Sequence, residues 1–290
     1  MKARWAEKEE LAALWHELPA PEEPFGQWEA WANLPHSWGA VVIEEGSTLQ
    51  GILPLGIRRI GPLRLYRQPR VLPWVPWRVR TPLPSSPPAL YTFQARFARA
   101  VAEWMRSTTP AYFRWTLPPL WTYTPPWYQH KIAPQAIGSF IIPPQTWKPE
   151  KDLLRKIRQV QDLPFLPLSP SEAVKIWEAH PPPGLPSQTQ KVLKALIAQP
   201  LPWRAWQIGH PWQALGIFLW GPTRIWYIAG THRARGQAGT ALLYHVIQQA
   251  LAEGKTFDFS GSTLPTIERF FRQFGGVWEL RLHLALWHLW

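Results

Sequence analysis

The chain has 290 residues, contains no cysteine and carries a formal net charge of +12 at pH 7. The absence of cysteine excludes disulfide bonds, thiolate metal sites and a cysteine nucleophile. One hydrophobic core seldom serves so long a chain, so the length predicts two domains.

The first half of the chain predicts alternating helices and strands. Apolar residues at spacings of three and four indicate helices, and alternating apolar residues indicate strands. We expect helices over residues 6–18, 27–32 and 90–106, and strands over residues 38–45, 49–60 and 111–117. The proline-rich segment 68–88 predicts an extended, packed loop, because proline interrupts helices and central strands.

The middle of the chain is strongly basic. Between Gly46 and Ala102 lie nine arginines and no acidic residue. The aromatic residues Tyr66, Trp74 and Trp77 are interleaved with these arginines. Such a surface would suit an RNA backbone, an anionic lipid headgroup or a sugar nucleotide. The alternative is an ordinary solvated surface of a basic protein.

A domain boundary is predicted near the centre of the sequence. Three prolines interrupt the segment between Ile142 and Lys151, and proline ends regular structure. The arginine-rich sequence LLRKIRQVQD (153–162) follows as a predicted helix. We therefore expect one domain over residues 1–146 and a second over residues 147–290.

The second half predicts two helices, a meander of strands, and then an alternation of helices and strands. The apolar residues that follow Gly239 recur at spacings of three and four, as in an amphipathic helix. We expect helices over 171–179 and 187–198, three strands between 202 and 230, a helix ending near 254, a strand over 255–262, a helix over 264–276 and strand alternation over 277–290. No internal repeat is visible in the sequence.

A glycine- and arginine-rich turn, GTHRARGQAG (230–239), joins the third of these strands to the next helix. Arg233, Gly236 and Ala238 give the spacing R-x-x-G-x-A. Free backbone N–H groups at a helix N-terminus bind anions, and Gly236 and Gly239 would let a pyrophosphate approach them. Arg233 and Arg235 would add charge-assisted donors. The alternative is a basic surface turn.

This order of elements, with this turn, resembles the GNAT acyltransferase fold, whose R/Q-x-x-G-x-G/A loop holds the pyrophosphate of coenzyme A. The C-terminal sequence FDFSGSTLPTIERFFRQFGG (257–276) resembles the terminal signature of the FemAB-like branch. The arginine-rich segment 153–162 and the strand pair 37–59 are similar to other parts of FemAB-like proteins. Ser260 stands where members with this ending often carry an acidic residue.

The resemblance implies an α/β (α+β) chain of two tandem GNAT-like domains, each with a mixed, mostly antiparallel sheet flanked by helices. Acyl transfer to an amine needs a dipole that faces the developing oxyanion and a route for the amine proton. By resemblance, the strand from Tyr227 to Gly230 would supply the oxyanion donors. Asp258 and Glu268 are the candidates for proton removal. Alternatively, Asp258 bonds a neighbouring loop and Glu268 pairs with Arg272.

Four further residues are candidates for substrate binding. Ser260 and Ser262 could contact an acceptor or a phosphate, or could simply turn the chain and cap the next helix. Arg269 and Arg272 lie three residues apart on one helix face and could bind an anionic substrate, or could be merely exposed to solvent. No histidine in this half pairs with a carboxylate at metal-ligand spacing, so no metal site is predicted.

The resemblance implies a FemAB-like acyltransferase that moves an acyl or aminoacyl group from acyl-CoA or aminoacyl-tRNA to an amine. A cell-wall precursor is one candidate acceptor. The donor would act as a co-substrate, and no tightly bound cofactor is predicted. The alternatives are a non-catalytic RNA-binding module and a cell-envelope assembly protein that keeps the fold.

The expected partners are an anionic substrate or tRNA. The charged N-terminus lacks the apolar run of a signal peptide, and no uncharged stretch is suited to span a bilayer. The sequence therefore predicts a cytoplasmic protein, with peripheral membrane association left open. It does not indicate an oligomeric state.

Overall fold

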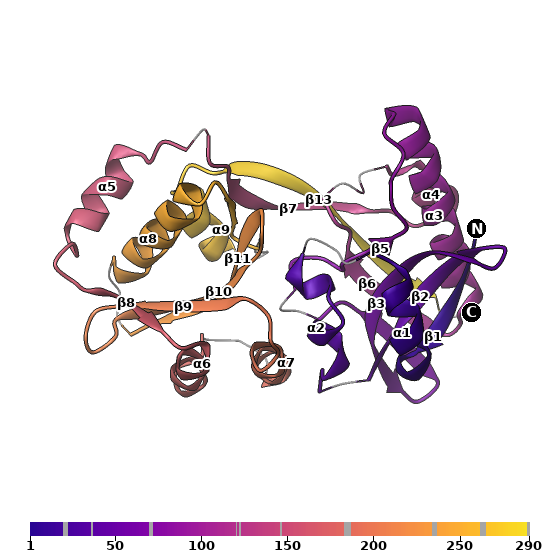
Figure 1. Ribbon diagram of the computed structural model, residues 1–290, viewed down its shortest axis with the longest axis horizontal. Coiled ribbons are helices and arrows are strands. Elements are labelled where there is room, and N and C mark those ends of the chain that lie inside the picture. The colour runs from indigo at the N-terminus through magenta and orange to yellow at the C-terminus, as the bar shows by residue number, and fades with distance from the viewer. Residues whose placement is uncertain are drawn as a thin grey trace. The chain divides into compact units, whose positions relative to one another are not determined.

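The computed structural model describes residues 1–19, 23–35, 37–69, 72–119, 121, 123–145, 147–182, 187–233, 237–261 and 265–288. The chain divides into two compact units (Figure 1). Unit 1 comprises Met1–Ile137 and Leu280–Trp290, and unit 2 comprises Gly138–Glu279. Compactness does not test independent folding, so the domain division near residue 146 stays a prediction.

Unit 1 is built on a sheet with one parallel pair of strands. Its strands are β1 (Lys2–Glu7), β2 (Trp38–Glu45), β3 (Thr48–Ile60), β4 (Leu63–Arg67), β5 (Arg78–Val79), β6 (Ala111–Thr116) and the last residues of β13 (Val277–His288). Its helices are α1 (Lys8–Leu14), η1 (Trp15–Glu17), η2 (Pro24–Gly26), α2 (Glu29–Ala32), α3 (Pro87–Ser107) and α4 (Pro125–Gln129). The sheet order is β1-β2-β3-β4-β6-β13, with β5 paired to β3.

Unit 2 has the same kind of sheet. Its strands are β7 (Gln135–Ile142), β8 (Phe165–Leu168), β9 (Trp203–Ile208), β10 (Ala214–Trp220), β11 (Arg224–His232) and β12 (Thr256–Asp258). Its helices are α5 (Lys151–Arg158), α6 (Pro170–Ala179), α7 (Ser187–Ile197), α8 (Ala238–Ala252) and α9 (Pro265–Arg272). The sheet order is β7-β12-β11-β10-β9-β8. Helix α8 packs on one face of this sheet, and α6 packs on the other (Figure 1).

The two units share one connection pattern that the sequence does not reveal. In unit 1 the meander β2-β3-β4 is followed by α3, and β6 then pairs parallel to β4. In unit 2 the meander β9-β10-β11 is followed by α8, and β12 then pairs parallel to β11. An antiparallel strand closes each series, β13 on β6 and β7 on β12. Parallel neighbours need such a helical crossover.

The apolar periodicity of α8 is confirmed. Its predicted core positions Leu242, Leu243, Val246, Ile247 and Ala250 are each at most 2% exposed. They pack against a cluster formed by β9, β10 and β12. The hydrophobic face of α8 therefore stabilises the crossover between β11 and β12.

The predicted aromatic and basic surface in the middle of the chain is wrong in its aromatic part. Tyr66, Trp74 and Trp77 are only 0%, 2% and 7% exposed. Tyr66 contacts the rings of Trp104 and Phe113 in the core of unit 1. These rings are buried although arginines are their neighbours in sequence, because burying a large aromatic side chain contributes strongly to the stability of the core.

Several short elements differ from the expectations. The N-terminal helix begins at Lys8 rather than at residue 6, because Lys2–Glu7 pairs with β2 as an edge strand. Strands β4 and β8 and helix α4 are additional. The segment 68–88 is irregular where described, apart from β5 and the first turn of α3, which begins at Pro87. Proline is favoured at a helix start because its missing N–H needs no partner there.

Within the part of the chain that the structure describes, no helix is long and apolar enough to cross a membrane.

His283 of unit 1 makes a pH-dependent contribution to stability. Arg114 Nε donates to His283 Nε2 (3.3 Å), so His283 Nδ1 carries the proton that reaches Thr116 Oγ1 (3.2 Å). Burial, and next the charge of Arg114, lower the pKa of His283 to about 4.

We expect the free energy of unfolding to fall as pH drops from about 6.5 to about 4, because the unfolded state binds the proton first. The loss due to His283 should be about 1–3 kcal/mol. Urea unfolding across this pH range measures it. His283→Gln should flatten the slope, and an unchanged slope would contradict the assignment.

Candidate active site

The candidate active site of unit 2 lies where β11 separates from β12. The two strands pair in parallel only over three positions, from Arg224 opposite Thr256 to Trp226 opposite Asp258. Beyond Trp226, the described part of β11 pairs only with β10, up to His232. The register shifts there, so that β11 carries one extra residue, as in a β-bulge. On the side away from β10, this part of the β11 backbone therefore has no strand neighbour among the described residues.

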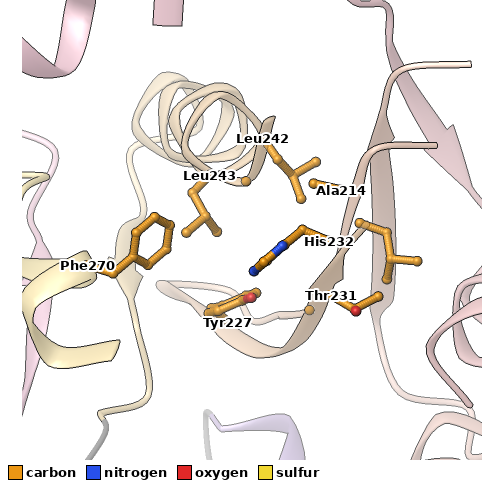
Figure 2. A pocket seen from close by; sticks show the side chains of 10 residues that line it. Ala214, Tyr227, Thr231, His232, Leu242, Leu243 and Phe270 are labelled. Carbon is orange, nitrogen blue, oxygen red and sulfur yellow. The ribbon is translucent and has the colours of Figure 1, made fainter. Parts of the chain in front are cut away.

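A pocket of about 70 Å³ adjoins this unpaired stretch. It is lined by residues of β10 and β11, by the first turns of α8 and by Phe270 of α9. Figure 2 shows the His232 ring between Tyr227 and the α8 residues Leu242 and Leu243. The predicted site residues among the lining side chains are Tyr227 and Gly239.

The Tyr227 hydroxyl is held by its packing. A Cβ on Gly230 would collide with this hydroxyl and would lie 2.9 Å from the Leu215 carbonyl oxygen, so only glycine leaves room for the ring. Burial raises the pKa of the Tyr227 phenol to about 12. The hydroxyl has no hydrogen-bond partner among the described residues. It is therefore a protonated donor that faces a pocket.

Gly230→Ala tests this packing. The added methyl group must displace the Tyr227 ring, so we expect loss of any activity that depends on the hydroxyl. Overpacking should also lower the free energy of unfolding by about 1–3 kcal/mol. Gly46→Ala is the control. A Cβ at Gly46 would meet no atom within 4 Å, but φ is +62° there, so alanine should destabilise this turn without changing the pocket. Full activity in Gly230→Ala would contradict the proposed placement.

The described parts of the predicted phosphate turn lie beside the N-terminus of α8. Arg235 and Gly236 lie outside the described residues. The Arg233 amide donates to the Gln213 carbonyl (2.9 Å), and its guanidinium lies 4.4 Å from the centre of the Trp212 ring. The N-cap residue Gln237 makes no side-chain cap to α8. No described side chain therefore occupies the first amides of this helix, and such amides can bind an anion.

Gly239 is not required by the fold. A Cβ there would have no heavy atom within 4 Å, whereas the neighbouring Ala238 is buried. Glycine in a helix costs about 0.5–1 kcal/mol relative to alanine. The glycine leaves free space next to the pocket, which a ligand backbone could approach.

Asp258 belongs to a buried ionic cluster and does not line the pocket. Its Oδ1 accepts from Ser139 Oγ and from the Ser260 amide, both at 2.7 Å. Its Oδ2 lies 3.1 Å from Arg224 Nη1. Arg224 in turn binds Glu279 through two bonds of 2.7 and 2.8 Å. The geometry favours the loop-bonding alternative for Asp258, and its role as a base stays a prediction.

Three solved structures superpose on nearly the whole chain. "Crystal structure of FemX" has a TM-score of 0.57 with 12% identity, covering 99% of this chain and 98% of that one. L-PGS from Bacillus licheniformis has a TM-score of 0.57 with 9% identity, covering 97% and 92%. A GNAT-family acetyltransferase from Colwellia psychrerythraea has a TM-score of 0.50 with 10% identity, covering 98% and 99%.

The chain has the FemAB-like fold of two GNAT-type units. This confirms the fold that the resemblance implied. Its sequence matches no protein-family model and no curated protein. At these identities the likeness is one of fold, and it leaves the donor and the acceptor to be argued from the site.

In this FemAB-like fold, Ser260 lies two residues beyond the end of β12. Its backbone has a φ of +60°, and its Oγ is buried without a hydrogen-bond partner in the described structure. The strained turn is held by the bond from the Ser260 amide to Asp258 and continues into Gly261 with φ +75°. Ser262 lies outside the described residues.

The predicted residues of α9 lie on its exposed side. Glu268 accepts from Arg272 Nε at 3.1 Å, as the ion-pair alternative predicted. Arg269 is exposed. The structure therefore does not bring Glu268, Arg269 or Arg272 into the set of pocket-lining residues.

Two pocket residues were missed in the sequence. The sequence predicts no site role for His232, and Phe270 enters only as part of the C-terminal signature. Both line the pocket. The available signal was their place: His232 ends the strand before the phosphate turn, and Phe270 lies in the helix after β12. A sequence cannot show that these two segments converge.

Proposed function

We propose that the protein is a FemAB-like acyltransferase that moves an acyl or aminoacyl group from acyl-CoA or aminoacyl-tRNA onto an amine. The observation that carries this proposal is the Tyr227 hydroxyl, which faces a pocket where β11 leaves β12, next to the N-terminus of α8 (Figure 2). Pocket, donor hydroxyl, unpaired strand and anion-binding helix end are the parts that acyl transfer needs.

The chemistry assigns a role to each part. The amine nitrogen attacks the carbonyl carbon, and the carbonyl oxygen becomes an oxyanion. Alternate amides of a strand point to the same side, so amides between Tyr227 and Gly230 that do not bond to β10 would stabilise the oxyanion. The bond to the leaving sulfur or oxygen then breaks, Tyr227 donates its proton to that atom, and the proton released by the amine restores the phenol.

The amine must lose one proton as the leaving group gains one. His232 lines the pocket, and histidine is the residue that most often serves as a general base. Asp258 is less suited, because Ser139, Ser260 and Arg224 already engage its carboxylate. We assign Asp258 the positioning of the β12 end, from which the strained Ser260 turn departs.

The donor would be anchored by its phosphates. The uncapped N-terminus of α8, the guanidinium of Arg233 and the free space at Gly239 support this placement, and Arg235 and Gly236 would complete the turn. The pyrophosphate of coenzyme A and the phosphates of a tRNA end share this chemistry.

The acceptor would be anionic, with a cell-wall precursor as one candidate. Arg58, Arg59 and Arg64 are exposed on the β3–β4 hairpin of unit 1, and Arg59 lies directly opposite Arg64. Facing like charges are unfavourable without an anion. These arginines support an anionic partner for a protein that acts in the cytoplasm or at the membrane surface.

Calorimetric titration with acetyl-CoA and with charged tRNA tests the donor site. Arg233→Ala should weaken binding of the true donor about 10-fold or more, because a charge-assisted phosphate contact is lost. Arg204→Ala is the matched control. Arg204 also stacks on a tryptophan, Trp220, but it pairs with Glu253 just beyond the opposite end of α8.

Binding of neither donor would overturn the proposal. Salt-sensitive RNA binding without transfer would favour the non-catalytic alternative. The exposed arginines of the β3–β4 hairpin are consistent with that alternative.

A further inference from the structure

We infer that the transferred group is short and has no charged side chain, and that Gly239 and Phe270 set this limit. This rests on the proposed function and narrows its substrate class. The size and the chemistry of the pocket beside Tyr227 carry it (Figure 2).

The pocket is small. Its volume is about 70 Å³, about half of the roughly 150 Å³ that holds a benzene molecule in an engineered cavity. An acetyl, propionyl or alanyl group fits such a space, whereas a hexanoyl or lysyl chain exceeds it. Leu215, Leu242 and Leu243 are at most 2% exposed. These walls cannot retreat without opening the close-packed core.

The walls of the pocket are largely apolar. Five of the lining side chains are aliphatic or aromatic hydrocarbon groups: Ala214, Leu215, Leu242, Leu243 and Phe270. No carboxylate occurs among the described lining residues. The ammonium group of a lysyl side chain would therefore lose its hydration without gaining an anionic partner, which is unfavourable.

Gly239 and Phe270 border the pocket from two different helices. The Cβ position of Gly239 is open, so a larger residue there removes pocket volume without a clash. Phe270 is half-buried and contacts Phe271 and Phe274 with ring centres 5.9 and 5.6 Å away. A smaller residue at position 270 therefore adds volume without removing a fully buried side chain.

A series of coenzyme A thioesters tests the limit on the intact chain. Calorimetry would compare CoA, acetyl-CoA, propionyl-CoA and hexanoyl-CoA, and then one tRNA charged with either alanine or lysine. If coenzyme A thioesters bind, we expect hexanoyl-CoA to bind at least about 10-fold more weakly than acetyl-CoA. If charged tRNA binds, we expect the lysyl ester to bind about 10-fold more weakly than the alanyl ester. Non-specific apolar binding would give the opposite order for the thioesters.

Two variants then move the limit in opposite directions. In Phe270→Ala, the affinity for the ligand with the longer group should come to within about 3-fold of the affinity for the ligand with the shorter group. Gly239→Leu should weaken the binding of acetyl-CoA about 10-fold relative to the binding of free CoA. It should not lower Tm, because leucine has a higher helix propensity than glycine. Ile267→Ala, on the exposed part of α9, is the control and should leave the ratios unchanged.

The outcomes separate this inference from the proposed function. If long or charged groups bind the unaltered protein as tightly as short ones, or if Phe270→Ala leaves the ratio unchanged, the limit is overturned while the acyltransferase proposal stands. If no thioester and no charged tRNA binds, the proposed function falls and the limit falls with it.

Discussion

Tyr227→Phe is expected to lower the rate of acyl transfer about 10²- to 10⁴-fold, the usual contribution of a general acid. The substitution removes only the hydroxyl, which faces the pocket and has no partner among the described residues. The free energy of unfolding should therefore change little. The measurement is release of the leaving thiol or tRNA hydroxyl in the presence of an amine, together with urea unfolding.

Tyr244→Phe is the matched control for this substitution. Its hydroxyl accepts from Gln248 Nε2 (3.0 Å) on α8, and it does not line the pocket. We expect a normal rate for this variant. An unchanged rate in Tyr227→Phe would remove Tyr227 from the mechanism.

The raised pKa of Tyr227 adds a pH signature. The phenol stays protonated in the folded protein until pH approaches about 12. The transfer rate should therefore show no loss from Tyr227 ionisation between pH 8 and pH 10. The unfolded state releases this proton from about pH 10. The contribution of Tyr227 to stability should thus be present below pH 10 and fall as pH rises from about 10 to 12.

Asp258→Ala is expected to have the largest effect on stability, lowering the free energy of unfolding by about 3–5 kcal/mol. The change removes the acceptor of Ser139 Oγ and of the Ser260 amide, and it removes one of the two carboxylates beside Arg224. Buried groups left without their partner are costly. Chemical denaturation measures the loss, and Asp258→Asn should recover part of it, because the amide oxygen can still accept hydrogen bonds.

Glu268→Ala tests the second of the two bases that the sequence suggested, against the proposed base His232. Its bond to Arg272 is exposed, so its loss should change the free energy of unfolding by less than about 0.5 kcal/mol. If Asp258→Asn keeps full stability but abolishes transfer, Asp258 acts in the chemistry and its structural assignment is wrong. If Glu268→Ala abolishes transfer, Glu268 is the base.

Local regularities made much of unit 2 predictable. Helix α8 carries a continuous apolar face, so its spacing alone indicated both the helix and its buried residues. The strands β9, β10 and β11 are separated by turns that contain proline and glycine, and these residues indicated the strand boundaries. Tyr227 was found because it lies on the strand that leads into the phosphate turn. Each of these features depends on neighbours within a few residues.

Strands without a strong local pattern were missed. Strand β1 is an edge strand with a single buried residue, Ala6, and β8 has only four residues, including a proline. Their strand form comes from pairing with β2 and β9. Burial likewise decided that Tyr66, Trp74 and Trp77 face the core rather than an anionic ligand.

The sequence by itself determined the order of elements from α6 to β13, the glycine- and arginine-rich turn before α8 and the resemblance to FemAB-like proteins. Only the tertiary structure decided which residues converge. Ser139 meets Asp258 across 119 positions of sequence, and Phe270 lines the same pocket as Tyr227, which β10, β11, α8 and α9 enclose. Periodicity reports the environment of one segment, whereas a pocket or a buried ion pair depends on how distant segments pack.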